Sequence, residues 1–466
     1  LSRRVRMTWM SAVEIAEKVR SGSLRAMDVT EQTIAEIAAR NPLLNAFTLV
    51  TAERARREAA RVDRLREEGK DPGCLAGVPF AVKNLFDIKG EVTLAGSKIN
   101  RDLPPAQQDA ILIQRLTAAG AILVGALNMG EYAYDFTGEN LHYGASRNPH
   151  DPQRMSGGSS GGSGAAVAGG LVPIALGSDT NGSIRVPASL CGIFGFKPTY
   201  GRLSRAGTFP FCSSLDHVGP LARSAKDLAL AYDVMQGHDD VDPGLSPRPV
   251  EPTGSLSAEL DPSLRIATLG GYFAKQGTAA SQQALQRVAE VLKITQELEL
   301  PEVAEARAAA YVITNAESSA LHLPNLRQRA ADYDPDVRDR MLAGALLPAV
   351  AYLQAQRVRA RFQRQVAEIF RRFDVLLAPA TPMTAPAIGQ KTMALDGEEM
   401  LVRPHLGLYT QPFSFIGLPV VTVPVQLPDS LPIGVQIIAA PWQEAKALHV
   451  ARVLEARGFR NAIPQS

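Results

Sequence analysis

The sequence has 466 residues, of which 45% are hydrophobic and 21% are charged, and its 49 basic and 47 acidic residues leave a formal net charge of +2. This composition is typical of a globular protein with a large core, and the balance of charge excludes an overall field that would recruit nucleic acid or an anionic membrane. Three scattered cysteines, Cys74, Cys191 and Cys212, exclude a disulfide framework and a CxxC metal site.

The N-terminal segment gives the first expectations about location. Residues 1–6 are basic and precede Met7, so we expect them to lie outside the fold as an extension. The segment lacks the apolar stretch and cleavage site of a signal peptide. The sequence also has no run of about 18 apolar residues that could span a bilayer. We therefore expect a cytoplasmic protein.

Helices are predicted first along the chain. Ser11 with Glu14, and Asp28 with Glu31, have the spacing of helix N-cap signals, and apolar positions follow each pair. A third, highly charged helix is predicted over residues 51–68.

The pattern then changes to that of buried strands alternating with helices. Residues 77–87 form a short run rich in valine and phenylalanine, and a helix over 109–120 precedes a strand over 121–127. Further strands are predicted over 172–176, 264–269, 375–378, 420–425 and 433–439, and further helices over 222–235, 351–373 and 443–456. The alternation predicts an α/β fold with a sheet covered by helices on both faces.

One segment resembles a domain boundary. Residues 242–262 carry five prolines and few large apolar residues. Strand candidates lie on both sides of this segment, which a single mixed sheet built from distant segments would explain. We therefore expect one domain over residues 7–466, with a Pro-rich surface excursion at 242–262 and a helical subdomain around 275–373.

The most distinctive segment is the glycine- and serine-rich stretch over residues 156–189. Two apolar runs, at 165–168 and 171–176, argue against a flexible linker. A dinucleotide fingerprint is also weak, because Val167 occupies the place of the third glycine, and no Walker A lysine follows. The stretch therefore indicates an active site built on serine hydroxyls and close backbone N–H groups.

A nucleophile elbow is one interpretation of this stretch. Gly157, Ser159 and Gly161 satisfy the GxSxG pattern. An elbow needs a strand immediately before the serine, whereas residues 148–155 are polar and contain two prolines. The histidine of a triad would have to come from downstream positions that stand in no distinctive surroundings, namely His322, His405 or His449.

A second interpretation uses two serines and a lysine. Ser183 follows the apolar run that ends at Gly177, so a strand delivers it to a tight turn. Candidate oxyanion donors there are the backbone N–H groups of Thr180, Asn181, Gly182 and Ser183. Lys83 lies in a strand-like run, where burial would lower its pKa and make it a neutral base. The alternative is that the side chain of Lys83 reaches solvent or pairs with Asp87 and has no catalytic role.

Three motifs together resemble the amidase signature family. They are GVPFAVKN at 77–84, GGSSGGSGAAVA at 157–168 and GSDTNGSIRVPASLCGIFGFKPTYGR at 177–202. In this family the two catalytic serines stand 24 positions apart, as Ser159 and Ser183 do here. The resemblance extends over nearly the whole chain. It implies the amidase-signature fold, with a central mixed β-sheet covered by helices on both faces.

The resemblance also implies a role for each motif residue. Ser183 would be the nucleophile that forms the acyl-enzyme. Ser159 would be a bridging serine, held by a cis peptide bond, and Lys83 would take its proton. Asp179 and Arg185 look like a structural pair that shapes the nucleophile turn. The resemblance places Ser160 in a supporting position beside the relay.

Residues outside the motifs carry less information about the substrate. The segments 129–137, 155–157 and 209–217 are expected to form the pocket walls, because they lie near the motifs in sequence. Tyr134, Arg154 and His217 are candidates to hold a substrate carboxylate. One departure from the family pattern is informative, since most members carry glycine where this chain has Asn181. Its side chain is expected to narrow or polarise the pocket.

Within the family, residues 178–195 and the segments that follow look closest to enzymes that hydrolyse 1-carboxybiuret in cyanuric acid breakdown. This resemblance implies cleavage of a small urea-like amide, with no metal or cofactor. It also implies a small helical accessory subunit, like that of the similar glutaminase in glutamyl-tRNA amidotransferase. A homodimer core is a separate expectation. We do not expect the chain to bind nucleic acid directly. The alternatives are ammonia supply within a tRNA amidotransferase, an esterase using Ser159 and a non-catalytic scaffold subunit.

Overall fold

The structure is a computed structural model that describes residues 9–254, 256–461 and 463–464. The expectation for residues 1–6 therefore concerns a segment outside the described residues. Within the described part of the chain, none of the helices is both long and apolar enough to cross a membrane.

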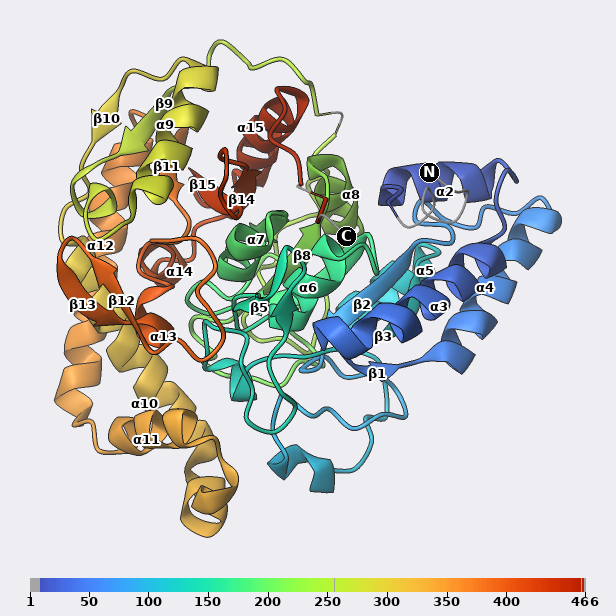
Figure 1. Cartoon of the computed structure of the whole chain (residues 1–466), viewed down its shortest axis with the longest axis horizontal. Helices are drawn as coiled ribbons and strands as arrows, with labels where there is room; N and C mark the ends of the chain where they lie inside the picture. Colours follow the sequence, from blue (N-terminus) through green and yellow to red (C-terminus); the bar gives the residue numbers. More distant parts are fainter. Residues whose placement is uncertain (1–8, 255, 462, 465–466) are drawn as a thin grey trace.

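A large mixed sheet forms the centre of the molecule, and in the described residues it has 11 strands (Figure 1). In spatial order the strands are β1 (Phe47–Val50), β3 (Ile122–Leu127), β2 (Pro79–Lys83), β6 (Ile174–Asp179), β8 (His217–Ala222), β7 (Phe194–Lys197), β14 (Val420–Val425), β15 (Ile433–Ala439), β11 (Val375–Pro379), β9 (Ile266–Leu269) and β10 (Glu297–Leu298). Neighbours far apart in sequence, such as β7 and β14, show that distant segments build one sheet.

The direction of the strands varies across the sheet. Strands β3, β2 and β6 run parallel to one another, as do β11, β9 and β10, and the pairs between β6 and β11 are antiparallel. Val82 lies opposite Leu176, so Lys83 ends its strand beside the last residues of β6. Most central strands are buried along their whole length, and this explains their continuous apolar runs.

Helices cover both faces of the sheet, as predicted. Figure 1 shows α3 and α4 on the N-terminal strands, α6 and α7 over the middle, and α9 and α15 on the C-terminal strands. The α-helices are α2 (Ala12–Arg20), α3 (Ala26–Leu44), α4 (Ala52–Glu67), α5 (Ile111–Ala118), α6 (Gly161–Ala168), α7 (Arg185–Cys191), α8 (Ala225–Met235), α9 (Ala279–Leu292), α10 (Val303–Arg329), α11 (Pro335–Ala345), α12 (Ala349–Phe370), α13 (Val402–His405), α14 (Gln411–Phe415) and α15 (Glu444–Ala456). The α/β fold class is therefore confirmed.

The two predicted N-caps have different outcomes. Ser11 and Glu14 form a complete capping box at the start of α2. The second prediction is wrong, because α3 begins at Ala26 and Asp28 lies inside its first turn. The carboxylate of Asp63, which belongs to α4, accepts hydrogen bonds from the first backbone N–H groups of α3 at 2.7 and 3.1 Å. A side chain from a neighbouring helix thus replaces the local cap.

The Pro-rich segment and the region after it are continuous with the sheet. Residues 242–262, apart from 255, contain no helix or strand, and β9 follows them as a member of the main sheet. The expected helical region contains α9, α10, α11 and α12 together with the short strand β10. The division into one domain with a helical subdomain stays a prediction.

Short elements complete the architecture. Two hairpins lie outside the main sheet, β4 (Arg147–Asn148) with β5 (Asp151–Met155), and β12 (Thr392–Leu395) with β13 (Glu398–Leu401). The 3₁₀ turns are η1 (Ile99–Asp102), η2 (Glu131–Ala133), η3 (Gly271–Ala274) and η4 (Ala330–Asp332). Because β5 belongs to a separate hairpin, Ser159 does not follow a strand of the main sheet.

Candidate active site

Lys83 is the last residue of β2, and its side chain is fully buried. Its Nζ lies 2.6 Å from Oγ of Ser159 and 2.9 Å from Oγ of Ser178. Burial excludes the alternative in which this lysine reaches solvent, and the Asp87 carboxylate accepts a hydrogen bond from a threonine hydroxyl instead. The structure therefore brings together two of the three predicted catalytic side chains from segments far apart in sequence.

The burial of Lys83 also changes its protonation. Loss of solvation lowers its pKa from 10.5 to about 7, against the opposing attraction of the carboxylates of Asp179, Asp216 and Asp135. A large share of the lysine is therefore neutral near neutral pH. A neutral amine at hydrogen-bond distance from a serine hydroxyl can act as a general base.

Two adjacent serines of the glycine-rich stretch contact Lys83 and the Ser183 turn, Ser159 the lysine and Ser160 the turn. The peptide bond between Gly158 and Ser159 is cis. Ser160 Oγ donates to the carbonyl of Ser178 at 3.2 Å, and its backbone N–H donates to the carbonyl of Ser183 at 3.3 Å. Ser160 thus ties the Ser159 segment to the nucleophile turn. Nearly all of this stretch is buried, which excludes the flexible-linker interpretation.

The Ser183 turn connects β6 to α7. Gly182 has a φ of +144°, and a Cβ on it would lie 2.1 Å from Oγ1 of Thr410, so both conformation and space require glycine. The hydroxyl of Thr410 donates to the carbonyl of Asn181 at 2.7 Å. Within the described residues, the backbone N–H groups of Asn181, Gly182 and Ser183 have no hydrogen-bond acceptor. They are therefore available to a developing oxyanion.

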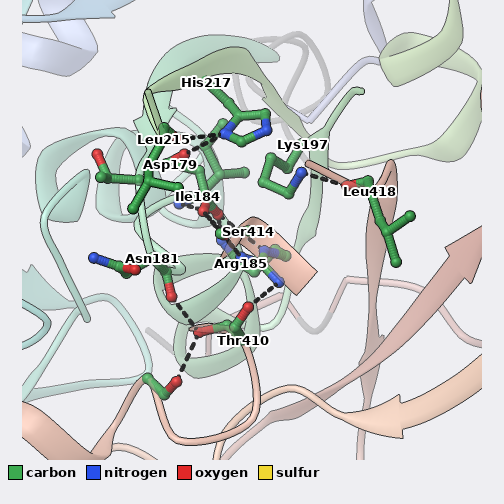
Figure 2. Close-up of polar contacts among 12 residues, drawn as sticks. Asp179, Asn181, Ile184, Arg185, Lys197, Leu215, His217, Thr410, Ser414 and Leu418 are labelled. Carbon is green, nitrogen blue, oxygen red and sulfur yellow. Dashed lines mark hydrogen bonds and ion pairs between the residues drawn. The ribbon is translucent and has the colours of Figure 1, made fainter. Parts of the chain in front are cut away.

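A buried ion pair holds this turn in place (Figure 2). Nη2 and Nε of Arg185 lie 2.9 and 3.0 Å from the two carboxylate oxygens of Asp179, and both side chains are fully buried. Burial raises the pKa of Asp179, but the charge and hydrogen bonds of Arg185 outweigh burial and hold it below its ordinary value. Asp179 Oδ2 also accepts from the backbone N–H of Ile184 at 3.1 Å. These contacts fit the expected structural role of the pair.

Ser183 lies on the wall of a narrow cavity with a volume of about 20 Å³. The sequence predicted three of its other lining residues, namely Tyr134, Thr180 and Asn181. The wall segments predicted at 129–137 and 209–217 also contain four of the lining residues, namely Ala133, Asp135, Phe136 and Phe211. The sequence missed Tyr311, Arg340, Pro404 and Gln411. The cavity is therefore completed by α10, α11 and the segment that leads into α14.

The three candidates for substrate binding lie in different surroundings. Tyr134 is on the cavity wall, where Arg340 stacks 3.8 Å from the centre of its ring. Arg154 is half-exposed on β5, where Nη1 donates to the carbonyl of Ala385 at 3.1 Å. His217 is buried on β8 with Nδ1 3.0 Å from the carbonyl of Asp179, and neither it nor Arg154 lines the cavity. Burial lowers the pKa of His217 well below its ordinary value.

Comparison with known proteins identifies the family of this chain. The model of the Amidase family matches residues 28–448. The chain belongs to the amidase family. This amidase is 53% identical over 452 residues to AtzE of Pseudomonas sp. (strain ADP), which is a 1-carboxybiuret hydrolase subunit, covering 97% of this chain and 99% of that protein. It is 36% identical to the GatA-type chain of glutamyl-tRNA(Gln) amidotransferase from Chloroflexus aurantiacus (strain J-10-fl), covering 92% and 93% of the two chains.

Solved structures share the fold of this amidase. One chain belongs to "an unexpected vestigial protein complex" that "reveals the evolutionary origins of an s-triazine catabolic enzyme". It aligns with a TM-score of 0.96 at 52% identity, covering 98% of this chain and 100% of that chain. A bacterial aryl acylamidase of the amidase signature family aligns with a TM-score of 0.88 at 28% identity, covering 97% and 96%. The predicted family and enzyme class, an amidohydrolase, are confirmed.

The cavity residues that the sequence did not reveal share one property. Arg340 and Gln411 lie on helices without a recognisable motif, far along the chain from Ser183. No local signal marks them, because they reach the amidase cavity only when α11 and α14 pack beside the nucleophile turn. An arginine or a glutamine in a helix without a recognisable motif is more often a solvated surface residue.

Proposed function

We propose that this amidase hydrolyses a small urea-like amide, 1-carboxybiuret, through an acyl-enzyme on Ser183 and releases ammonia. The identity of 53% to part of a 1-carboxybiuret hydrolase, over nearly the full length of both chains, supports this substrate. The observation that carries the chemistry is the 2.6 Å contact between Nζ of Lys83 and Oγ of Ser159 in a fully buried site.

The proposed relay begins with neutral Lys83. Its Nζ takes the proton of Ser159 Oγ, which takes the proton of Ser183 Oγ as that oxygen attacks the scissile carbonyl carbon. The relay then runs in reverse and protonates the leaving nitrogen, so that the C–N bond breaks and ammonia departs. Water attacks the acyl-enzyme by the same relay and regenerates the Ser183 hydroxyl.

Backbone N–H groups stabilise the oxyanion in this proposal. Those of Asn181, Gly182 and Ser183 have no acceptor in the described residues, and that of Thr180 precedes them in the same turn. Preorganised donors of this kind lower the barrier because they need no reorientation when charge develops. The Asp179–Arg185 pair acts through the turn, by fixing its backbone.

The charge on the cavity wall supports an anionic substrate. Arg340 donates from Nη2 to the carbonyl of Tyr134 at 2.6 Å and from Nε to the carbonyl of Asp336 at 2.7 Å. Within the described residues it forms no ion pair with a carboxylate. Asp135 lies on the same wall, where its carboxylate accepts hydrogen bonds from the backbone N–H of Gly138 and the hydroxyl of Thr137. The cation of Arg340 can therefore pair with a substrate carboxylate such as that of 1-carboxybiuret.

Ammonia release tests this function. We expect Ser183→Ala, Ser159→Ala and Lys83→Ala to lower turnover of 1-carboxybiuret by at least about 1,000-fold while circular dichroism stays that of the folded protein. Ser163→Ala is the matched control, because Ser163 is also a buried serine of the glycine-rich stretch, but its hydroxyl donates to the carbonyl of Leu176. Near-normal turnover in Ser183→Ala would contradict the proposal.

The same measurements separate the alternatives. Loss of activity in Ser159→Ala with an active Ser183→Ala would favour an esterase-like elbow. Failure of a fluorophosphonate probe to label Ser183 would favour a scaffold role without an acyl-enzyme. Glutamine hydrolysis that strictly depends on partner proteins would favour ammonia supply to a tRNA amidotransferase, to which the 36% identity with the amidotransferase chain gives some support.

We also propose a cytoplasmic location, a homodimer core and a small helical accessory subunit, with no direct contact to nucleic acid. A related solved chain belongs to a protein complex, which supports a partner for this chain. Light scattering on the purified chain, alone and after co-expression with a candidate small partner, tests the assembly. A monomer in both preparations would contradict it.

A further inference from the structure

Two residues that line the Ser183 cavity each carry a buried polar atom with no hydrogen-bond partner among the described residues. These atoms are Oδ1 of Asn181 and Nε2 of Gln411. Asn181 is 6% exposed and Gln411 is fully buried, so neither atom has bulk water as a partner. Buried polar atoms without partners are rare and unfavourable. Here one is an acceptor and the other a donor, and both belong to residues that line the cavity of the candidate nucleophile.

The other end of each amide forms a hydrogen bond to a neighbour. Nε of Arg307 donates to Oε1 of Gln411 at 2.7 Å, and because a guanidinium can only donate, the amide of Gln411 must present Nε2 elsewhere. Nδ2 of Asn181 donates to Oγ1 of Thr314 at 3.0 Å. Arg307 and Thr314 both belong to α10. A single helix therefore contacts both amides.

The backbone also brings the two residues together. Thr410, which precedes Gln411, donates its hydroxyl to the carbonyl of Asn181, and its own carbonyl accepts from Nη1 of Arg185 at 2.9 Å (Figure 2). The segment carrying Gln411 is thus tied to the nucleophile turn. The acceptor and the donor are preorganised parts of one site.

We propose that this pair selects ureides over carboxamides. Asn181 Oδ1 accepts from the N–H that flanks the scissile carbonyl in a ureide, and Gln411 Nε2 donates to a second carbonyl or carboxylate oxygen of the substrate. A carboxamide has a methylene in place of that N–H and leaves Asn181 unpaired. This inference rests on the proposed function and names the chemical feature that the site recognises.

Two pairs of compounds test the selection, because each pair differs only by N–H or methylene. Biuret is matched by malonamide, and allophanate by malonamate. We would measure kcat/KM for ammonia release from all four with the wild type, Asn181→Leu, Gln411→Leu and Gln236→Leu. Leucine keeps the approximate volume of the amides. Gln236 is a buried glutamine whose Nε2 donates to the carbonyl of Glu251, outside the cavity, and it serves as the control.

We expect different patterns from the two cavity variants. Asn181→Leu lowers kcat/KM for each ureide by about 10- to 100-fold more than for its methylene partner, because only the ureides lose a hydrogen bond to Oδ1. Gln411→Leu lowers both members of each pair by the same factor, because both keep the distant oxygen. Gln236→Leu leaves every ratio unchanged. We compare the ratio of kcat/KM between paired compounds in each variant with the same ratio in the wild type. This comparison cancels the difference in intrinsic reactivity between the two compounds and any general loss of activity in the variant.

The results that would contradict this inference differ from those that would contradict the proposed function. If the wild type hydrolyses carboxamides but neither ureide nor 1-carboxybiuret, both the proposed function and this inference are wrong. If it hydrolyses ureides, and Asn181→Leu lowers both members of each pair equally, the proposed function stands and the selection by Asn181 is wrong. Affinities measured by calorimetry on the Ser183→Ala protein should show the same ratios without turnover. Equal affinities for biuret and malonamide there would also overturn the inference.

Discussion

Replacing Lys83 by methionine should make the folded chain more stable in acid and less stable in alkali. Lys83 is fully buried, and burial lowers its pKa from 10.5 to about 7. Methionine is similar in length and carries no charge, so the substitution removes the cost of burying an ammonium group while filling the same space. The expected result in acid is a variant that cannot hydrolyse the substrate but has a higher free energy of unfolding than the wild type.

The magnitude follows from the pKa. Below pH 7 the lysine is protonated in both the folded and the unfolded chain, so the full cost of burial is present, about 5 kcal/mol. Between about pH 7 and 10.5 the unfolded chain binds the proton and the folded chain does not, so stability rises with pH. Above 10.5 both states are neutral, and no cost remains.

Two lost contacts oppose this gain. Nζ of Lys83 lies at hydrogen-bond distance from Ser159 and Ser178, and methionine removes both bonds, which together contribute about 2 kcal/mol. Lys83→Met should therefore exceed the wild type in free energy of unfolding by about 3 kcal/mol at pH 6. At pH 10 the variant should be less stable by about 1 kcal/mol. The two curves should cross near pH 9.

Urea denaturation followed by circular dichroism at pH 6, 8 and 10 measures this crossing. Lys70→Met is the control, because the Lys70 side chain is 66% exposed and pairs only with Glu68 on the surface. We expect its effect to stay within about 0.5 kcal/mol at each pH. A difference between wild type and Lys83→Met that does not change with pH would refute a buried lysine with a lowered pKa.

Three further predictions concern the reaction and the nucleophile turn. If neutral Lys83 is the base, kcat/KM for ammonia release should rise about 10-fold between pH 6 and 8, with a midpoint near 7, and a flat profile would contradict this role. Arg185→Met leaves the carboxylate of Asp179 buried without its partner and should cost about 3 to 5 kcal/mol in urea denaturation, unless Asp179→Asn accompanies it. Gly182→Ala places a Cβ 2.1 Å from Oγ1 of Thr410 and should lower kcat at least about 10-fold, whereas a fully active variant would show that the turn has room.

Sequence reasoning located the strands that are buried on both faces. Strands such as β14 and β15 are almost entirely apolar, with Thr422 and Gln436 as their polar residues, because no residue in them faces solvent. It missed β8, whose residues 217–222 include Gly219 and Pro220. A proline argues against a central strand, yet Pro220 lies opposite Leu176 in the middle of the sheet. Packing also requires Gly219, because a Cβ there would lie 2.2 Å from the carbonyl of Phe196.

Some residues of the candidate site could likewise be predicted from local sequence, and others could not. Lys83, Ser159 and Ser183 stand in motifs whose local sequence carries the signal, and the structure places Lys83 against Ser159. Arg340 and Gln411 carry no such signal, since their place depends on how α10, α11 and α14 pack. The start of α3 was misplaced for the same reason, because its cap comes from α4. Local chemistry could therefore be predicted, whereas contacts between distant elements could not.

The strand directions of the mixed sheet explain why Lys83 lies close to the glycine-rich stretch. β2 and β6 are parallel neighbours, so their carboxyl ends meet at one edge of the sheet, where open α/β sheets place their ligands. Lys83 ends β2, and Asp179 ends β6 just before the Ser183 turn. An antiparallel pairing would send the two ends to opposite edges. The strand direction therefore brings the base and the nucleophile turn together, and Ser159 lies beside the base.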